Sequence, residues 1–158
     1  MKKSEIQEFT RRITQSNGSN LVVITYEIFF AHMQDAKCAY ENVEWEEFKQ
    51  SIRQGQRAIQ ELMDALSYKH EMASNLYRIY SYCKDLLAKA MYKQSADELE
   101  EAVVLMKKLY KSFKTVAEQD TSAPIMKNTQ TVYAGMTYGK HQLTESLSDQ
   151  GSSRGFRV

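Results

Sequence analysis

The scarcity of helix-breaking residues constrains the fold of this chain most strongly. Its only proline is Pro124, and Gly55 is the only glycine between Gly18 and Gly135. Proline and glycine are the usual residues of turns, and a β-sandwich or barrel needs a turn signal roughly every 8–12 residues. The first 120 or so residues therefore predict long helices, and the total of 158 residues fits one domain.

Apolar residues spaced three and four apart predict four long helices, over residues 20–41, 45–66, 72–92 and 95–119. In the second range the spacing is regular throughout, and Gly55 lies on the apolar side, where it lets another helix approach closely. Long helices joined by short connections pack as antiparallel neighbours. The sequence thus predicts an all-α fold, an antiparallel up-down-up-down four-helix bundle.

Composition divides the chain into three parts. Residues 1–20 form a short, polar N-terminal leader in which Ile6, Phe9 and Ile13 have the spacing of a short amphipathic helix. Residues 21–119 form the predicted bundle. Residues 120–158 hold the only proline and four of the six glycines, and this C-terminal tail is predicted to be mostly flexible.

Several classes of function are disfavoured by the sequence. Lys and Arg total 21 against 20 Asp and Glu, which gives no basic field for nucleic acid. No apolar run is long enough for membrane insertion, and the N-terminus lacks the apolar core of a secretory signal, so we expect a cytoplasmic protein. No Glu-x-x-His pair, phosphate-binding loop or metal-ligand spacing occurs. We therefore expect no cofactor, no metal and no enzyme.

Two of the predicted helices carry more apolar residues than a simple bundle needs. On a helical projection, one stripe of residues 21–33 contains Tyr26 and Phe29, and a separate stripe contains Ile24 and Ile28. A bundle helix needs a single apolar stripe. Residues 72–92 also carry a second stripe. Two explanations stay open at this point: the leader and tail cover the extra residues, or the extra residues form a groove for an amphipathic partner segment.

The order and spacing of these helices resemble the flagellar secretion chaperones, the FliS family. The run from Leu21 to Ala36 is similar to the family's first helix, with Tyr26-Glu27 at the place of a Tyr-Asp pair. Residues 59–66 are similar to the end of the family's second-helix pattern, and residues 75–80 are similar to the Asn-Leu-x-x-x-Tyr element of its third helix. The resemblance covers residues 10–119. It departs at 14–20, where the family often has Thr-Ala-Ser-Pro-Glu-Glu, and it does not cover the tail.

The resemblance implies a chaperone that binds the disordered C-terminal region of flagellin, prevents premature polymerisation and keeps flagellin competent for flagellar type III export. The implied partners are the flagellin C-terminal segment and a component of the export gate. The rival interpretation is a helical scaffold or dimerisation protein without an unfolded client. Monomer and dimer are both open.

The doubled apolar stripes motivate the choice of candidate client-binding residues. We predict Val23, Tyr26 and Phe30 in the first long helix, and Tyr77, Tyr80, Leu87 and Met91 in the third. A further hypothesis is that the leader, or the apolar segment 133–138 of the tail, occupies the same groove when no client is bound.

Overall fold

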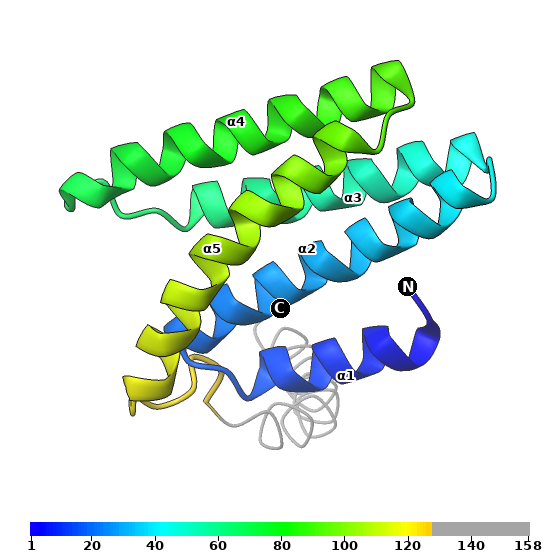
Figure 1. Cartoon of the computed structure of the whole chain (residues 1–158). Coiled ribbons are helices and arrows are strands. Elements are labelled where there is room, and N and C mark those ends of the chain that lie inside the picture. The colour runs from blue at the N-terminus through cyan, green and yellow to red at the C-terminus, as the bar shows by residue number, and fades with distance from the viewer. Residues whose placement is uncertain (128–158) are drawn as a thin grey trace, which may run out of the picture. The chain divides into compact units, whose positions relative to one another are not determined.

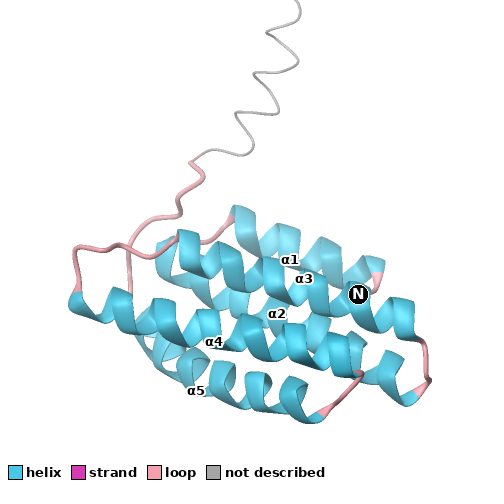
Figure 2. Cartoon of the chain, turned by 90° about the horizontal axis from the view of Figure 1, so that it is seen from above, coloured by secondary structure: helices cyan, strands magenta, loops and turns pink. Residues whose placement is uncertain are grey.

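The computed structural model describes residues 1–127, and this part of the chain contains five helices and no strand (Figures 1 and 2). The helices are α1 (Lys3–Thr14), α2 (Gly18–Glu41), α3 (Trp45–Asp64), α4 (Glu71–Lys93) and α5 (Asp97–Gln119). The compact unit runs from Met1 to Ile125. The prediction of an all-α fold is confirmed. The number of helices in the described part is five and not four, because the leader itself forms α1.

Local sequence sets where the helices begin. The Asn17 side chain caps α2, since its Oδ1 accepts a hydrogen bond of 2.8 Å from the backbone N–H of Asn20. At the start of α5, Ser95 makes two side-chain hydrogen bonds. The hydroxyl of Ser95 donates to the Glu98 carboxylate at 2.5 Å and accepts from the backbone N–H of Asp97 at 3.3 Å. The helix consequently begins at Asp97.

The four long helices pack around one core. Each contacts the next in the chain, and α2 also contacts α5, so that α2 and α4 lie on opposite sides with α3 and α5 between them. The core is rich in large apolar side chains that are fully buried: Tyr26, Phe29, Phe48, Ile52, Ile59, Tyr80, Leu87 and Met106. None of the helices in residues 1–127 is long and apolar enough to cross a membrane.

Gly55 allows α2 and α3 to pack closely, as its place in the sequence pattern predicts. A Cβ atom at this position would collide with the terminal methyl group of Met33 on α2. The side chain of Met33 therefore occupies the space that the glycine leaves open, and it is only 3% exposed.

Helix α1 packs along α2 and covers part of it. Arg12 pairs with Glu27 of α2 at 2.5 Å, and the N-terminal amino group pairs with Asp35. The chain that leaves α5 returns to the α1–α2 turn, where Ile125 donates a backbone hydrogen bond to Ser16 at 3.0 Å. The tail was predicted to be mostly flexible over residues 120–158, and its part from residue 128 on lies outside the described residues. The predicted apolar segment 133–138 lies outside them as well.

Candidate functional site

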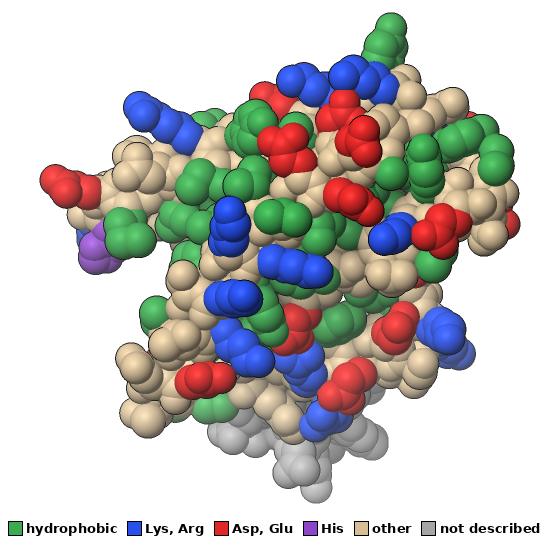
Figure 3. All heavy atoms as spheres, viewed as in Figure 1, with side chains coloured by type: hydrophobic (Ala, Val, Ile, Leu, Met, Phe, Trp, Pro, Cys, Tyr) green, Lys and Arg blue, Asp and Glu red, His purple; other side chains and the backbone are tan. Residues whose placement is uncertain are grey.

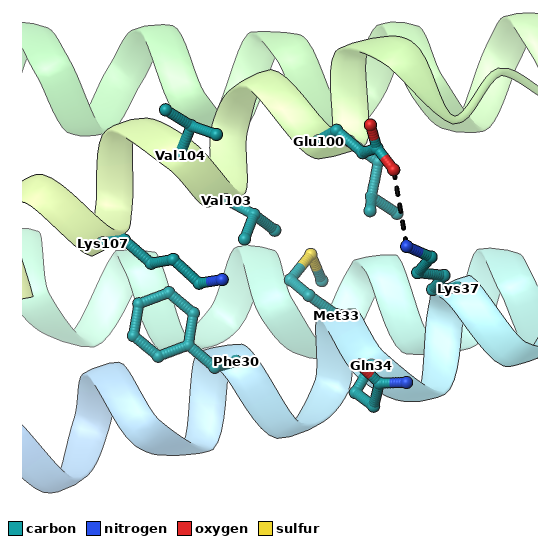
Figure 4. A pocket seen from close by; sticks show the side chains of 9 residues that line it. Phe30, Met33, Gln34, Lys37, Glu100, Val103, Val104 and Lys107 are labelled. Carbon is teal, nitrogen blue, oxygen red and sulfur yellow. Dashed lines mark ion pairs between the residues drawn. The ribbon is translucent and has the colours of Figure 1, made fainter.

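An open groove of about 300 Å³ lies between α2 and α5 (Figure 4). Its base is apolar, and charged or amide side chains stand at its edges. The lining residues are Phe30, Met33, Gln34 and Lys37 from α2, and Leu99, Glu100, Val103, Val104 and Lys107 from α5.

The pattern of α5 explains why valines line one side of the groove. Leu99, Ala102 and Met106 form the buried side of this helix. Val103 and Val104 follow directly after Ala102 and are rotated out of the core toward the groove and solvent. Val104 is 52% exposed. The result is an apolar edge that no side chain in the described part of the molecule covers completely.

Charged side chains mark the two ends of the groove. Lys37 of α2 and Glu100 of α5 form an ion pair of 3.5 Å across one end, as the dashed line in Figure 4 shows. Lys107 lies near Phe30 in the same view. Because both partners of the Lys37–Glu100 pair are largely exposed, it contributes little to stability. A ligand that breaks this ion pair on binding therefore loses little binding free energy.

Aromatic residues support the groove from below. The ring of Phe30 meets that of Tyr110 edge-on, with centroids 5.5 Å apart. The Tyr110 hydroxyl donates to Glu27 at 3.0 Å, and Glu27 also pairs with Arg12 of α1. Burial, together with the hydrogen bond to Glu27, raises the pKa of Tyr110, which keeps this hydroxyl a donor. The wall of the groove is thus connected through Glu27 to α1.

The comparison with known proteins decides the family. The model of a protein family described as flagellar protein FliS matches residues 1–120. The chain belongs to the FliS family. Its matched region contains all five helices and ends one residue after α5. No curated protein matches the chain. Membership in the FliS family implies a flagellar chaperone role, and this family is one of chaperones and not of enzymes.

Four of the seven residues predicted to bind a client are buried in this FliS-family fold. Tyr26 and Leu87 are fully buried, Tyr80 is 1% exposed and Val23 is 7% exposed. The hydroxyl groups of Tyr26 and Tyr80 form a hydrogen bond of 2.6 Å in the core. Burial raises the pKa of both tyrosines, so both hydroxyls stay protonated.

The other three predicted residues are accessible but lie apart. Phe30 is half-buried and lines the α2–α5 groove. Tyr77 is 43% exposed and lines a hollow between α3 and α4. Met91 is half-buried and packs against the core. The structure therefore brings Tyr26, Tyr80 and Phe30 near one another, and it does not place all seven residues in one groove.

The predicted client-binding residues do not include the α5 side of the groove. Val103 and Val104 depart from the regular apolar side of their helix, and this departure is the signal that identifies them. The second stripes of α2 and α4 were the more conspicuous feature. These two helices lie on opposite sides of the core, and much of their extra apolar surface meets inside it.

The groove offers features suited to binding a partner. In the described residues, no group of three or more His, Cys, Asp or Glu side chains could hold a metal ion. Burial raises the pKa of the Cys83 thiol to about 11, so this thiol stays protonated and unreactive near neutral pH. The features that the groove offers are apolar contact area and one exchangeable ion pair at its edge.

Proposed function

We propose that this FliS-family protein is a cytoplasmic export chaperone that binds the disordered C-terminal region of flagellin. By covering that region it prevents premature polymerisation and keeps flagellin competent for flagellar type III export. The observation that carries this proposal is the exposed apolar groove between α2 and α5 in a chain of this family. Its shape and composition fit one amphipathic helical segment.

The physical requirement on the client follows from the groove. A disordered segment loses about 1–2 kcal/mol of backbone entropy for each residue that it orders. Each large apolar side chain that it buries returns about 1.5–3 kcal/mol. A client segment therefore needs apolar residues on one face of a helix, at spacings of three and four, to contact Phe30 and Val103 together. Client residues outside the groove stay unfolded, and an unfolded client remains competent for export.

The predicted client-binding residues divide into two groups in this proposal. Phe30 contacts the client directly in the α2–α5 groove, and Tyr77 and Met91 extend the contact over other faces. Val23, Tyr26, Tyr80 and Leu87 reach a client only if the helices separate, because they are buried. No residue of α1 lines the groove. Competition between the leader and the client would thus require α1 to move from its place along α2.

The arrangement that we propose for residues 21–119 is an antiparallel four-helix bundle, preceded by the leader 1–20 and followed by the tail 120–158. It is supported by the closed ring of contacts from α2 through α3, α4 and α5 back to α2. The connections between consecutive long helices are short. We also propose that the loaded chaperone is delivered to a component of the export gate.

Val104→Glu tests the groove assignment. The substitution puts a carboxylate at the apolar edge, and because Val104 is 52% exposed the fold should tolerate it. Tyr92→Glu is the matched control, since Tyr92 is 89% exposed and does not line the groove. Binding of a labelled flagellin C-terminal peptide is followed by fluorescence anisotropy. We expect Val104→Glu to weaken binding about tenfold or more and the control to leave it unchanged; equal affinities in both variants would refute the assignment.

The rival interpretation, a scaffold or dimerisation bundle, makes a different prediction for the same sample. The molar mass is measured by light scattering with and without the flagellin peptide. A chaperone forms a complex with the peptide and suppresses flagellin polymerisation in a turbidity assay. A stable homodimer that is indifferent to the peptide would favour the rival.

A further inference from the structure

A second groove lies between α4 and α5, on the other flank of α5. It measures about 370 Å³ and is lined by Arg78, Ile79, Tyr82, Leu105, Lys108 and Leu109. Its base is formed by Ile79, Leu105 and Leu109, which are all half-buried. The polar atoms belong to long side chains at its edges. None of these residues lines the α2–α5 groove, so the two grooves are separate surfaces.

The charge of α5 is divided along its length. Four acidic residues lie between positions 97 and 101, whereas residues 102–117 contain four lysines and no acid. In Figure 3 basic side chains gather over the C-terminal half of α5, with hydrophobic side chains beside them. The lysines are Lys107, Lys108, Lys111 and Lys114, and none of them forms an ion pair within residues 1–127.

The helix dipole does not explain the whole of this basic cluster. Cations are favoured in the last turn of a helix. Lys108 lies about three turns before the end of α5 at Gln119, beyond the reach of that effect. Arg78, on the neighbouring helix α4, lines the same groove and also forms no ion pair in the described part of the chain. Positive charge from two helices thus borders one apolar surface.

The acidic group near this groove lies at one end and already has a partner. The hydroxyl of Tyr82 donates to the carboxylate of Glu101 at 2.8 Å. Glu101 belongs to the acidic first turns of α5, away from Lys108. One end of the groove is therefore acidic and the rest is bordered by cations. A ligand with carboxylates would place them toward Arg78 and Lys108.

We propose that the α4–α5 groove is a second docking surface, for an acidic amphipathic helix of a partner protein other than the client. A helix fits because an open groove between two helices, about one turn long on each, accepts apolar side chains at spacings of three and four. An acidic helix fits because the unpaired cations Arg78 and Lys108 attract carboxylates beside those apolar contacts. Since the two grooves lie on opposite flanks of α5, the chaperone can hold client and partner at once.

Within residues 1–127, a second copy of this chain offers no suitable helix for the groove. Its separate amphipathic helix, α1, carries Lys3, Arg11 and Arg12 against only two glutamates, and it is packed along α2. The apolar sides of the long helices are used in the core. Charge complementarity thus favours a different protein, and self-association is one of the outcomes that the experiment distinguishes.

The probe is a synthetic amphipathic peptide of about 18 residues, with leucines at helical spacing and glutamates on the flanking positions. A matched peptide has lysine at every glutamate position. Binding of each to the full chain is measured by fluorescence anisotropy at two salt concentrations. We expect the acidic peptide to bind, with an affinity that falls as salt rises, and the basic peptide to bind at least tenfold more weakly.

The double variant Arg78→Glu/Lys108→Glu locates the site. Each attraction becomes a repulsion, and we expect the affinity for the acidic peptide to fall about tenfold or more. The control is Lys69→Glu/Lys89→Glu, which changes the net charge equally at two exposed positions that do not line this groove. The flagellin C-terminal peptide is measured in parallel, and its affinity should change less than about twofold in both variants.

Each other result overturns the proposal. Equal weakening by the control variant would show attraction to overall charge and not to the groove. Competition between the acidic peptide and the flagellin peptide would assign the α4–α5 groove to the client. A doubled molar mass that Arg78→Glu/Lys108→Glu abolishes would assign it to a second copy. Absence of binding by the acidic peptide would exclude the docking surface, whereas the proposed client function is tested separately by Val104→Glu.

Discussion

The buried tyrosine pair gives the sharpest prediction about the core. The hydroxyls of Tyr26 and Tyr80 lie 2.6 Å apart, and the two residues are 0% and 1% exposed. Neither hydroxyl forms another hydrogen bond in residues 1–127. Tyr26→Phe therefore removes one hydrogen bond and leaves the Tyr80 hydroxyl buried without a partner, and Tyr80→Phe does the reverse.

The expected magnitudes follow from these two effects. The lost hydrogen bond costs about 1 kcal/mol, and a buried hydroxyl without a partner adds about 1–3 kcal/mol. Each single substitution should lower the free energy of unfolding by about 2 kcal/mol. The double variant Tyr26→Phe/Tyr80→Phe leaves no unpaired hydroxyl and should cost about 1 kcal/mol in total. The two substitutions are therefore strongly non-additive, with a coupling of about 3 kcal/mol.

Urea unfolding of the wild type, the two single variants and the double variant measures this coupling. Tyr92→Phe is the control, because Tyr92 is 89% exposed, and its effect should be within about 0.5 kcal/mol. Additive single effects would refute the reasoning. Burial raises the pKa of Tyr26 and Tyr80, so the coupling should be the same at pH 6 and about pH 9.

The same variants show whether these buried residues take part in client recognition. If Tyr26 and Tyr80 serve only the core, the folded phenylalanine variants should bind the flagellin peptide as the wild type does, within about twofold. A parallel loss of affinity in well-folded variants would indicate that α2 and α4 separate during binding, which the original prediction of these two residues as client contacts requires.

Three further changes have defined outcomes. Gly55→Ala should lower the free energy of unfolding by about 1 kcal/mol, because displacing the Met33 methyl outweighs the gain in helix propensity, and stabilisation in urea would contradict this. Val43→Asn should raise the free energy of unfolding by about 1 kcal/mol, since Val43 is exposed and has φ 61°, a conformation that asparagine tolerates better. An unchanged urea midpoint would contradict this backbone explanation. The side-chain hydrogen bond from Lys93 lowers the pKa of Glu98 from 4.5 to about 2, so its stabilising contribution is present above pH 4.5 and is lost as the pH falls toward 2. Glu98→Gln should flatten the stability profile over that range, and an unaltered profile would exclude this carboxylate as the cause.

The fold class and most helix boundaries could be predicted because they depend on local sequence. The regular apolar spacing of the helix that begins at Trp45 predicted its buried side, and Phe48, Ile52 and Ile59 are fully buried there. The Asn17 cap of α2 likewise depends on local sequence alone. These features need only helical periodicity and the hydrogen bonds of a helix end. The leader has the spacing of an amphipathic helix, but a helix as short as α1 depends on packing for its stability, so spacing alone does not determine that it forms.

The site was harder to predict because it depends on which helices become neighbours. The second stripes of α2 and α4 were interpreted as binding surfaces. In the structure these helices face each other through the core, where Tyr26 meets Tyr80, and α1 covers another part of α2. Periodicity identifies the apolar faces of a helix but not the partner of each face. The position of α5 beside both α2 and α4 decides where grooves form.

Exposed apolar surface after packing is therefore a better guide to partner binding than apolar excess in the sequence. Much of the excess on α2 is used by the core and by α1. On α5 the excess is divided between two flanks, with Val104 toward one groove and Leu105 toward the other. Val104 stays 52% exposed, and two lysines stand one turn further along the helix, at positions 107 and 108. Because one helix forms a wall of both grooves, a partner bound on one flank of α5 can stabilise the wall that the other partner uses, and binding of the two should be thermodynamically linked.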